Sequence, residues 1–206
     1  MFTLNSDTIY WILFAVPTIL IASTVHEYAH GWAAFKLGDP TAKAAGRLTL
    51  NPLKHIDPIG AISMVLFRFG WSKPVPINEY NFEKRELGTA LTALAGPVSN
   101  MLLALLGGLL NWIIRPNGIL YVILFVFVSI NISLAVFNLL PIPPLDGHKI
   151  VRALLPKKIR YYWEQLEKFS IFIILLFILP ISPLSAWTST FLTTVLSKIL
   201  SLLGFS

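Results

Sequence analysis

Cysteine is absent from the 206-residue chain, so disulfide bonds and thiolate metal ligands are both excluded. Charged residues are also scarce, since Asp, Glu, Lys and Arg make up 13% of the sequence, against about 25% in soluble domains. Hydrophobic residues fill 55% of the chain, and its mean hydropathy is +0.72. The composition therefore excludes an ordinary soluble domain and predicts an integral membrane protein, with the lipid bilayer as its surroundings.

Four long stretches are nearly free of charge, and three of them are long enough to cross a bilayer as helices. The fourth contains Pro180 and Pro183, which break helices and predict a hairpin over residues 160–206. Its first arm, Phe169–Ile181, is short for a full crossing. The four stretches are Thr8 to Phe35, Leu87 to Ile114, Pro116 to Leu145, and Phe169 to Ser197. We therefore expect one all-α, polytopic membrane domain over residues 1–206, with a core of three transmembrane helices over residues 8–150.

The connection between the first and second spans has a different pattern from an ordinary loop. A short alternating piece at residues 47–50 and an extended piece from Pro74 to Tyr80 predict a small β segment, since two prolines suit a sheet edge. The apolar run from Ile59 to Phe67 is too short to span and is typical of a re-entrant segment.

The distribution of basic residues predicts the orientation in the membrane. The net charge of +6 would suit a nucleic-acid-binding protein, but eight of the 16 Lys and Arg residues lie from Lys36 to Arg85 and six from Lys149 to Lys168. Such basic loops between spans stay in the cytoplasm. We therefore expect no nucleic-acid partner and an N-terminus on the outer side. The first stretch lacks the features of a cleaved signal peptide and is expected to remain as a span.

His26, Glu27 and His30 form the pattern H-E-x-x-H inside the first apolar stretch. On a helix, His26 and His30 lie on one face and point at a common position. This arrangement suits one Zn²⁺ held by two imidazoles, with Glu27 as the general base toward a water. The alternative is a helix end whose polar side chains reach the membrane surface. The cost of ionisable groups at membrane depth favours the metal site, which would lie nearer the cytoplasmic face.

Asp146 is the expected third protein ligand, because it ends the third stretch at the same membrane face as the histidine pair. Three prolines precede it and unwind the helix there, which is tolerated at membrane depth only beside a cavity or inside protein. The alternative is an ordinary Asp-Gly turn. Of the other histidines, His55 is expected to be structural, and His148 could orient a ligand or be solvated. Zinc is the favoured metal, although two His and one Asp would also accept iron or cobalt.

Three motifs together resemble the site-2 protease family of intramembrane metalloproteases. They are H-E-x-x-H at residues 26–30, G-P-x-x-N at 96–100 and N-x-x-P-x-P-x-x-D-G at 138–147. Residues 46–60 resemble the small bacterial members, which places the expected location in a bacterial cytoplasmic membrane. Many relatives carry a PDZ or CBS domain, and this chain has neither.

The resemblance implies one Zn²⁺ per chain, with His26, His30 and Asp146 as ligands and Glu27 as the general base. It implies regulated cleavage of transmembrane protein substrates, with Asn138 facing the active-site groove. Asn100 and Pro144 are further candidates for substrate contact, although Asn100 could equally bond a neighbouring helix. Two alternatives remain: a zinc-binding membrane transporter or sensor, and a pseudo-protease that binds membrane helices without cutting them.

Overall fold

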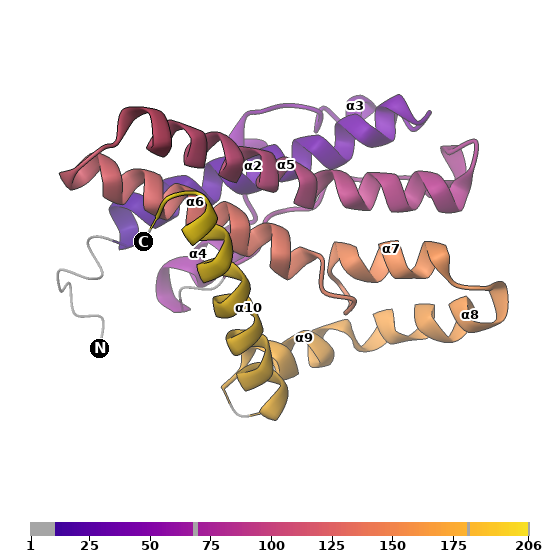
Figure 1. Ribbon diagram of the computed structural model, residues 1–206. Coiled ribbons are helices and arrows are strands. Elements are labelled where there is room, and N and C mark those ends of the chain that lie inside the picture. Colours follow the sequence, from indigo (N-terminus) through magenta and orange to yellow (C-terminus); the bar gives the residue numbers. More distant parts are fainter. Residues whose placement is uncertain (1–10, 68–69, 181, 206) are drawn as a thin grey trace.

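In the computed structural model, which describes residues 11–67, 70–180 and 182–205, the described chain is helical and contains no strand (Figure 1). Three helical segments are long and apolar enough to cross a membrane: Trp11–Lys36, Arg85–Ile114 and Gly118–Asn138. The first comprises a π-helical turn, η1 (Trp11–Ala15), and α2 (Val16–Lys36), and the others are α5 (Arg85–Ile114) and α6 (Gly118–Asn138). The all-helical class and the three core spans are therefore confirmed, while residues 8–10 of the first predicted stretch lie outside the described part.

The central helix α5 buries mainly small residues and leaves its large apolar side chains outside. Along α5, the buried positions include Gly96, Ala104, Gly107 and Gly108. The side chains of Leu102, Leu105, Leu109 and Ile113 on the same helix are about half exposed or more, between 48 and 67%. This distribution fits a protein whose solvent is lipid, because helices there associate by close packing rather than by hiding leucines.

The region between α2 and α5 differs from the predicted β segment. It contains α3 (Thr41–Ala44), a turn η2 (Pro52–Lys54), α4 (Pro58–Phe67) and a turn η3 (Glu79–Asn81). Among the described residues, the only β pairing is one isolated bridge between Ile56 and Ser72. Residues 73–78 have no regular secondary structure and form no ladder, and the last two residues of the predicted extended piece, Glu79 and Tyr80, lie in the turn η3. Two of residues 73–78 are prolines without an N–H, and the N–H groups of Val75 and Asn78 donate to side chains instead.

The C-terminal part is a bent arrangement rather than a tight hairpin. It runs through α7 (Asp146–Leu154), α8 (Lys157–Gln165), η4 (Leu166–Phe169), α9 (Ser170–Ile178) and α10 (Pro183–Leu202). The segment 157–178 and α10 meet at 69°. With nine residues, α9 is about 13 Å long and is shorter than a bilayer core. The predicted arm Phe169–Ile181 ends on a residue outside the described part.

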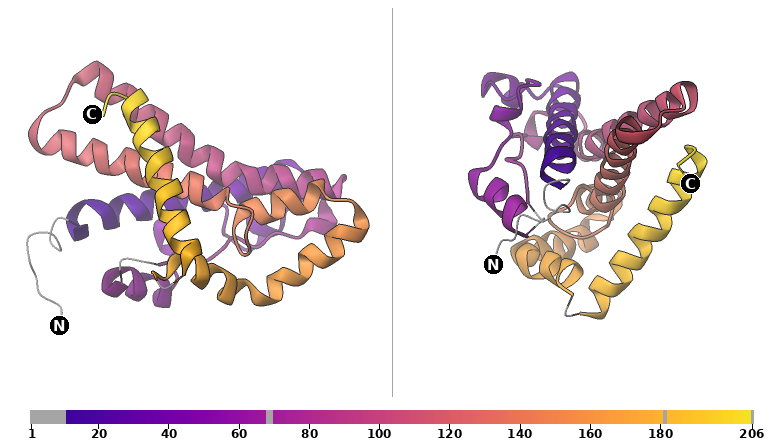
Figure 2. Two further views of the ribbon diagram at one scale, coloured as in Figure 1. Left: turned by 60° about the horizontal axis from the view of Figure 1, so that its bottom comes forward. Right: turned by 90° about the vertical axis from the view of Figure 1, so that its left-hand side faces the viewer.

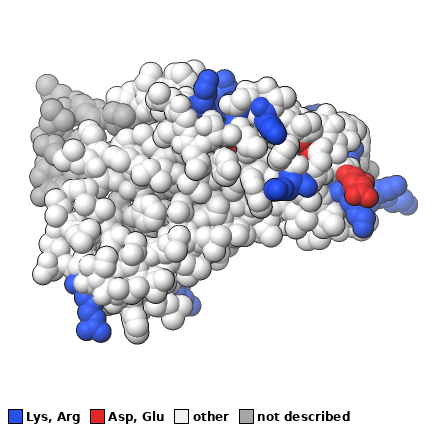
Figure 3. Space-filling model, turned by 90° about the horizontal axis from the view of Figure 1, so that it is seen from above, with Lys and Arg blue, Asp and Glu red and all other residues white. Residues whose placement is uncertain are grey.

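Two further views show how α10 joins the bundle (Figure 2). It leans across α6, and its C-terminal end returns to the connection between α5 and α6, where Asn111 Nδ2 donates to the carbonyl of Gly204 over 3.1 Å. A small apolar core of Ala104, Val128, Ile132, Leu200 and Phe205 lies there. In the space-filling view, Lys and Arg lie mainly toward one end, beside a broad uncharged surface (Figure 3).

Candidate metal centre

His26, His30 and Asp146 bring three ligand atoms together where α2 and α7 meet. The two histidines lie one turn apart on α2, and Asp146 is the first residue of α7. The Nε2 atoms of the histidines are 3.0 Å apart, and Asp146 Oδ2 lies 3.1 Å from that of His26 and 3.2 Å from that of His30. All three side chains are buried, with 7 to 8% of each residue exposed. The structure thus brings together the three predicted ligands in a nearly equilateral triangle.

Hydrogen bonds on the far side of each imidazole determine which nitrogen carries the proton. His30 Nδ1 lies 2.7 Å from the carbonyl oxygen of Thr92, and His26 Nδ1 lies 2.7 Å from Asn100 Oδ1. Both oxygens accept, so each Nδ1 donates and each Nε2 presents a lone pair toward the other and toward Asp146. Three facing acceptors at about 3 Å repel one another unless a cation lies among them.

A zinc ion fits this donor set. Tetrahedral Zn²⁺ with bonds of about 2.0 to 2.1 Å separates its ligand atoms by about 3.3 Å, close to the spacing in the triangle. A catalytic zinc is usually bound by neutral imidazoles and carboxylates. Each ligating imidazole donates from its other nitrogen to a supporting acceptor, as both histidines do here.

Gly96 allows both imidazoles to approach α5. A Cβ atom built at Gly96 would lie 2.4 Å from His30 Nε2 and 2.6 Å from His26 Nε2, far inside any tolerated contact. The glycine of G-P-x-x-N therefore faces the metal-binding atoms themselves. Sequence reasoning could suggest a close helix contact at Gly96, but it could not identify what the glycine contacts.

Asp146 is placed by the turn that precedes it. A Cβ atom at the next residue, Gly147, would lie 2.3 Å from the carbonyl oxygen of Leu139 and 2.4 Å from that of Leu140. Only glycine therefore lets α7 start directly against the end of α6. The Asp-Gly pair is thus part of the construction of the site and is no ordinary exposed turn.

The carboxylate of Glu27 is held by the extended segment that follows α4. Ser72 Oγ donates to Glu27 Oε1 over 2.7 Å, and the main-chain N–H of Val75 donates to Oε2 over 2.9 Å. Glu27 itself is 8% exposed. Sequence reasoning placed Val75 in an extended segment but did not single out Ser72, and no local pattern connects Ser72 with Glu27.

Asp39 anchors the other end of this extended segment. Its carboxylate accepts from the main-chain N–H of Asn78 and from Asn81 Nδ2, each over 2.7 Å, and from both the N–H and the hydroxyl of Thr41. Burial alone would raise the pKa of Asp39, but the donors on Thr41, Asn81 and Asn78 outweigh it and lower that pKa below its usual value. The segment is therefore attached at both ends to the region of α2.

A cavity of about 1010 Å³ opens onto the candidate centre. Glu27 and the three metal-binding residues line it, and so do Asn138 and Pro144, two of the predicted substrate contacts. Apolar residues from other elements complete its wall, among them Met64 of α4, Ile174 of α9 and Leu192 of α10. Its size, at the upper end of small-molecule sites, leaves room for a segment of peptide.

Asn100 lies behind His26 and is not part of the cavity lining. The residue is fully buried, at 0% exposure. Its Oδ1 accepts from His26, and its Nδ2 donates to the carbonyl of Ala22 and to Asn131 Oδ1, both over 3.0 Å. This position favours the alternative in which Asn100 bonds neighbouring helices, here by orienting a metal-binding histidine.

The two remaining histidines lie outside the ligand triangle. His55 Nε2 donates to the carbonyl of Thr49 over 2.8 Å and thereby closes the loop before α4. His148 is 1% exposed and stacks on Trp163 with ring centroids 5.1 Å apart. The Trp163 indole N–H also donates to the main-chain carbonyl of His148 over 3.1 Å. His55 therefore stabilises the loop before α4, as its predicted structural role requires. His148 packs between α7 and α8.

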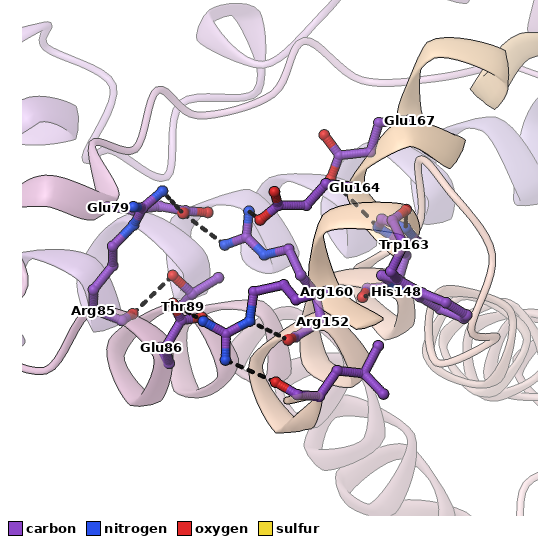
Figure 4. A network of polar contacts seen from close by, with 11 residues as sticks. Glu79, Arg85, Glu86, Thr89, His148, Arg152, Arg160, Trp163, Glu164 and Glu167 are labelled. Carbon is purple, nitrogen blue, oxygen red and sulfur yellow. Dashed lines mark hydrogen bonds and ion pairs between the residues drawn. The ribbon is translucent and has the colours of Figure 1, made fainter. Parts of the chain in front are cut away.

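An ion-pair network holds α7 in place at the charged end of the molecule (Figure 4). Arg152 of α7, 8% exposed, donates to Glu79 of η3 over 2.6 Å. Arg160 of α8 pairs with Glu86 at the start of α5 and donates to the carbonyl of Arg152 over 3.1 Å. The helix that begins with Asp146 is thereby joined to the segment that holds Glu27.

Comparison with known proteins identifies relatives of the chain. The profile of Peptidase family M50 matches residues 114–181. A Bacillus subtilis (strain 168) protein named "Putative zinc metalloprotease YwhC" is 39% identical over 184 residues, which cover 84% of each chain. Rip2 of Mycolicibacterium smegmatis, named in the same terms, is 32% identical over 137 residues, 63% of this chain and 52% of the relative. No solved structure matches.

Proposed function

The chain belongs to peptidase family M50, the site-2 protease family, and we propose that it is an intramembrane endopeptidase that cleaves transmembrane segments of other membrane proteins. It is a zinc-dependent protease and an integral membrane protein. The observation that carries the proposal is the triangle of His26, His30 and Asp146 beside Glu27, at a cavity between apolar helices.

In the proposed site, His26, His30 and Asp146 would hold the zinc. When bound, zinc supplies Lewis-acid activation of a water and of the scissile carbonyl. Glu27 takes a proton from that water as its oxygen bonds to the carbonyl carbon. Glu27 then gives the proton to the leaving amine nitrogen as the C–N bond breaks, so the carboxylate returns to its starting state.

The contacts of Glu27 suit this role. Ser72 and the main chain of Val75 each bond a different oxygen of the carboxylate, which fixes its plane without placing a positive charge beside it. A general base that is already held in position has less conformational entropy to lose when it binds its water in the transition state. Both of these donors are neutral.

A substrate helix must unwind before attack, because its carbonyls are otherwise bonded within the helix. We propose that residues 73–78 and the region of Leu48 receive the unwound segment by strand addition. The N–H groups of Lys73, Val75 and Asn78 already donate within the protein, so this segment would serve mainly through its carbonyls, which would accept from the freed N–H groups of the substrate. Asn138 and Pro144 line the same cavity and are proposed to contact the substrate. Charged substitutions at Ile77, which also lines the cavity, should reduce cleavage, and full cleavage in such variants would argue against this binding mode.

The proposed setting is a bacterial cytoplasmic membrane with the N-terminus outside and the active site toward the cytoplasm. Its support is the concentration of Lys and Arg in the two loops that adjoin the site. The 206 residues are proposed to act as one metalloprotease domain. A transporter or sensor would need a polar path through the spans, and membership of a protease family favours the enzyme over that alternative and over a pseudo-protease.

The decisive test compares purified wild type with Glu27→Gln on a panel of transmembrane substrates. The amide cannot take the proton, so cleavage should fall by about 10² to 10⁴-fold, while bound zinc should stay at one per chain. Cleavage that survives in Glu27→Gln would disprove the role of general base. One bound zinc without cleavage of any substrate by the wild type would favour the non-proteolytic alternatives.

A further inference from the structure

Two asparagines are completely buried between the membrane-spanning helices behind His26. Asn100 on α5 and Asn131 on α6 are both at 0% exposure. Side-chain amides at this depth are costly unless every polar group is bonded. Neither residue lines the cavity, so both amides serve the protein itself rather than a substrate.

The two amides form a hydrogen-bonded relay that crosses three helices. Asn131 Nδ2 donates to the main-chain carbonyl of Phe127 over 2.9 Å. Asn100 Nδ2 donates to Asn131 Oδ1 and to the main-chain carbonyl of Ala22, each over 3.0 Å. Asn100 Oδ1 accepts from His26 Nδ1 over 2.7 Å. The relay therefore runs from the backbone of α6 to a predicted metal ligand on α2.

The direction of every bond in this relay follows from its two ends. Main-chain carbonyls only accept, so the amide nitrogens must face Phe127 and Ala22. Asn131 then presents its oxygen to Asn100, and Asn100 presents its oxygen to His26. A histidine that faces an acceptor carries its proton on Nδ1, which leaves the Nε2 lone pair for a metal.

Removal of Asn131 would weaken this constraint. Asn100 Nδ2 would keep one acceptor, the Ala22 carbonyl, and would lose the other. Only the Ala22 carbonyl would then oppose rotation of the Asn100 amide, where two acceptors oppose it in the wild type. The rotated amide would present its nitrogen to His26 and favour the tautomer with a proton on Nε2, which cannot bind metal, so this tautomer should be more populated than in the wild type. His30 is not subject to this effect, because its Nδ1 donates directly to the carbonyl of Thr92.

We propose that Asn131, acting through Asn100, is a positioning residue that fixes the tautomer of His26 and thereby sets the zinc affinity of the site. The inference rests on the proposed function in one respect, the assignment of His26 as a ligand. It adds a residue that no motif marks, since Asn131 lies in the middle of an apolar span.

Zinc affinity, measured by competition with a chelator on the purified full chain, tests the relay directly. Asn131→Leu should weaken zinc binding about 10-fold, and Asn100→Leu by about 10- to 100-fold, the range for groups that orient a metal ligand. Asn111→Leu is the matched control, because Asn111 is a buried α5 asparagine whose amide donates to Leu203 and Gly204 at the other end of the helix. Its zinc affinity should stay within about twofold of wild type.

A second readout separates a positioning role from a loss of stability. With cobalt(II) in place of zinc, the ligand-field absorption bands should shift in Asn131→Leu and should match wild type in Asn111→Leu. Asn131→Gln keeps an amide in the membrane but moves it by one methylene, so it provides the same test if Asn131→Leu does not fold.

Equal zinc affinity and cobalt spectra in wild type and the folded Asn131 variants would overturn the proposal. An equal loss of affinity in Asn111→Leu would overturn it as well, because the effect would then be unspecific. His26→Ala distinguishes the two levels of the argument. If His26→Ala binds zinc like wild type, the ligand assignment fails; if it loses zinc while the Asn131 variants do not, only the relay fails.

Discussion

A single methyl group at Gly96 should abolish the metal centre. In Gly96→Ala the new Cβ would lie 2.4 Å from His30 Nε2 and 2.6 Å from His26 Nε2. Real Cβ contacts begin at about 3.0 Å, so at least one ring must move by about 0.6 Å, whereas ligand distances at a zinc site tolerate about 0.2 Å. The rings have little freedom to move, because Asn100 and Thr92 hold their Nδ1 atoms.

We expect zinc affinity in Gly96→Ala to fall at least about 100-fold, at or beyond the upper end of the range for indirect effects on a ligand. The matched control is Gly107→Ala, on the same helix, whose Cβ would lie 2.6 Å from Val128 Cγ2 of α6. Overpacking should cost either variant about 1 to 3 kcal/mol of stability, but only Gly96→Ala should lose zinc. Chelator competition on both purified variants provides the comparison, and equal zinc affinity in the two would refute the reasoning.

Three further predictions concern the supports of the site. Ser72→Ala removes one donor to Glu27, so kcat should fall about 10-fold at unchanged zinc content; an unchanged kcat in a cleavage assay would contradict the role. Arg152→Met removes the buried partner of Glu79, which keeps its ion pair with Arg85 at 3.5 Å, and should lower the free energy of unfolding by about 1 to 3 kcal/mol, measured by thermal denaturation in detergent and partly restored by Glu79→Leu. The pKa of Asp39 is lower in the folded state than in the unfolded state. Its carboxylate therefore stabilises the protein above the unfolded pKa of about 3.9, and this stabilisation is lost as the pH falls toward the folded pKa. Asp39→Asn should be less stable at neutral pH, and its free energy of unfolding should lack the acid-dependent loss that Asp39 gives the wild type in a titration down to about pH 3.

The fold class and the three core spans could be predicted because both depend on the solvent. A bilayer demands long uncharged helices, and the sequence contains three of them. The expected β segment was wrong in its pairing, since a single bridge joins Ile56 and Ser72. Proline suits a sheet edge, but it does not reveal that the N–H groups of Val75 and Asn78 donate to Glu27 and Asp39.

The predicted ligands differ in how much of their placement is local. His26 and His30 share a helix face, so their proximity follows from the helical repeat. Asp146 lies 120 positions from His26, and the charge distribution predicted only that both lie at the same membrane face. The contact of 3.1 Å depends on the turn before α7 and on Gly147, which no periodicity describes. The catalytic and ligand roles of these residues stay predictions until the variants above are measured.

The sequence by itself determined the membrane class, the three spans and the shared helix face of His26 and His30, because each depends on neighbours within one or two turns or on the surrounding lipid. Only the tertiary structure decided which groups orient that chemistry: Gly96 against the imidazoles, Ser72 on Glu27, and Asn131 behind His26. These contacts join segments far apart in the chain. The hydrogen-bond directions behind His26 are set by the main-chain carbonyls of Ala22 and Phe127, which are the same for every residue type and leave no mark in a sequence.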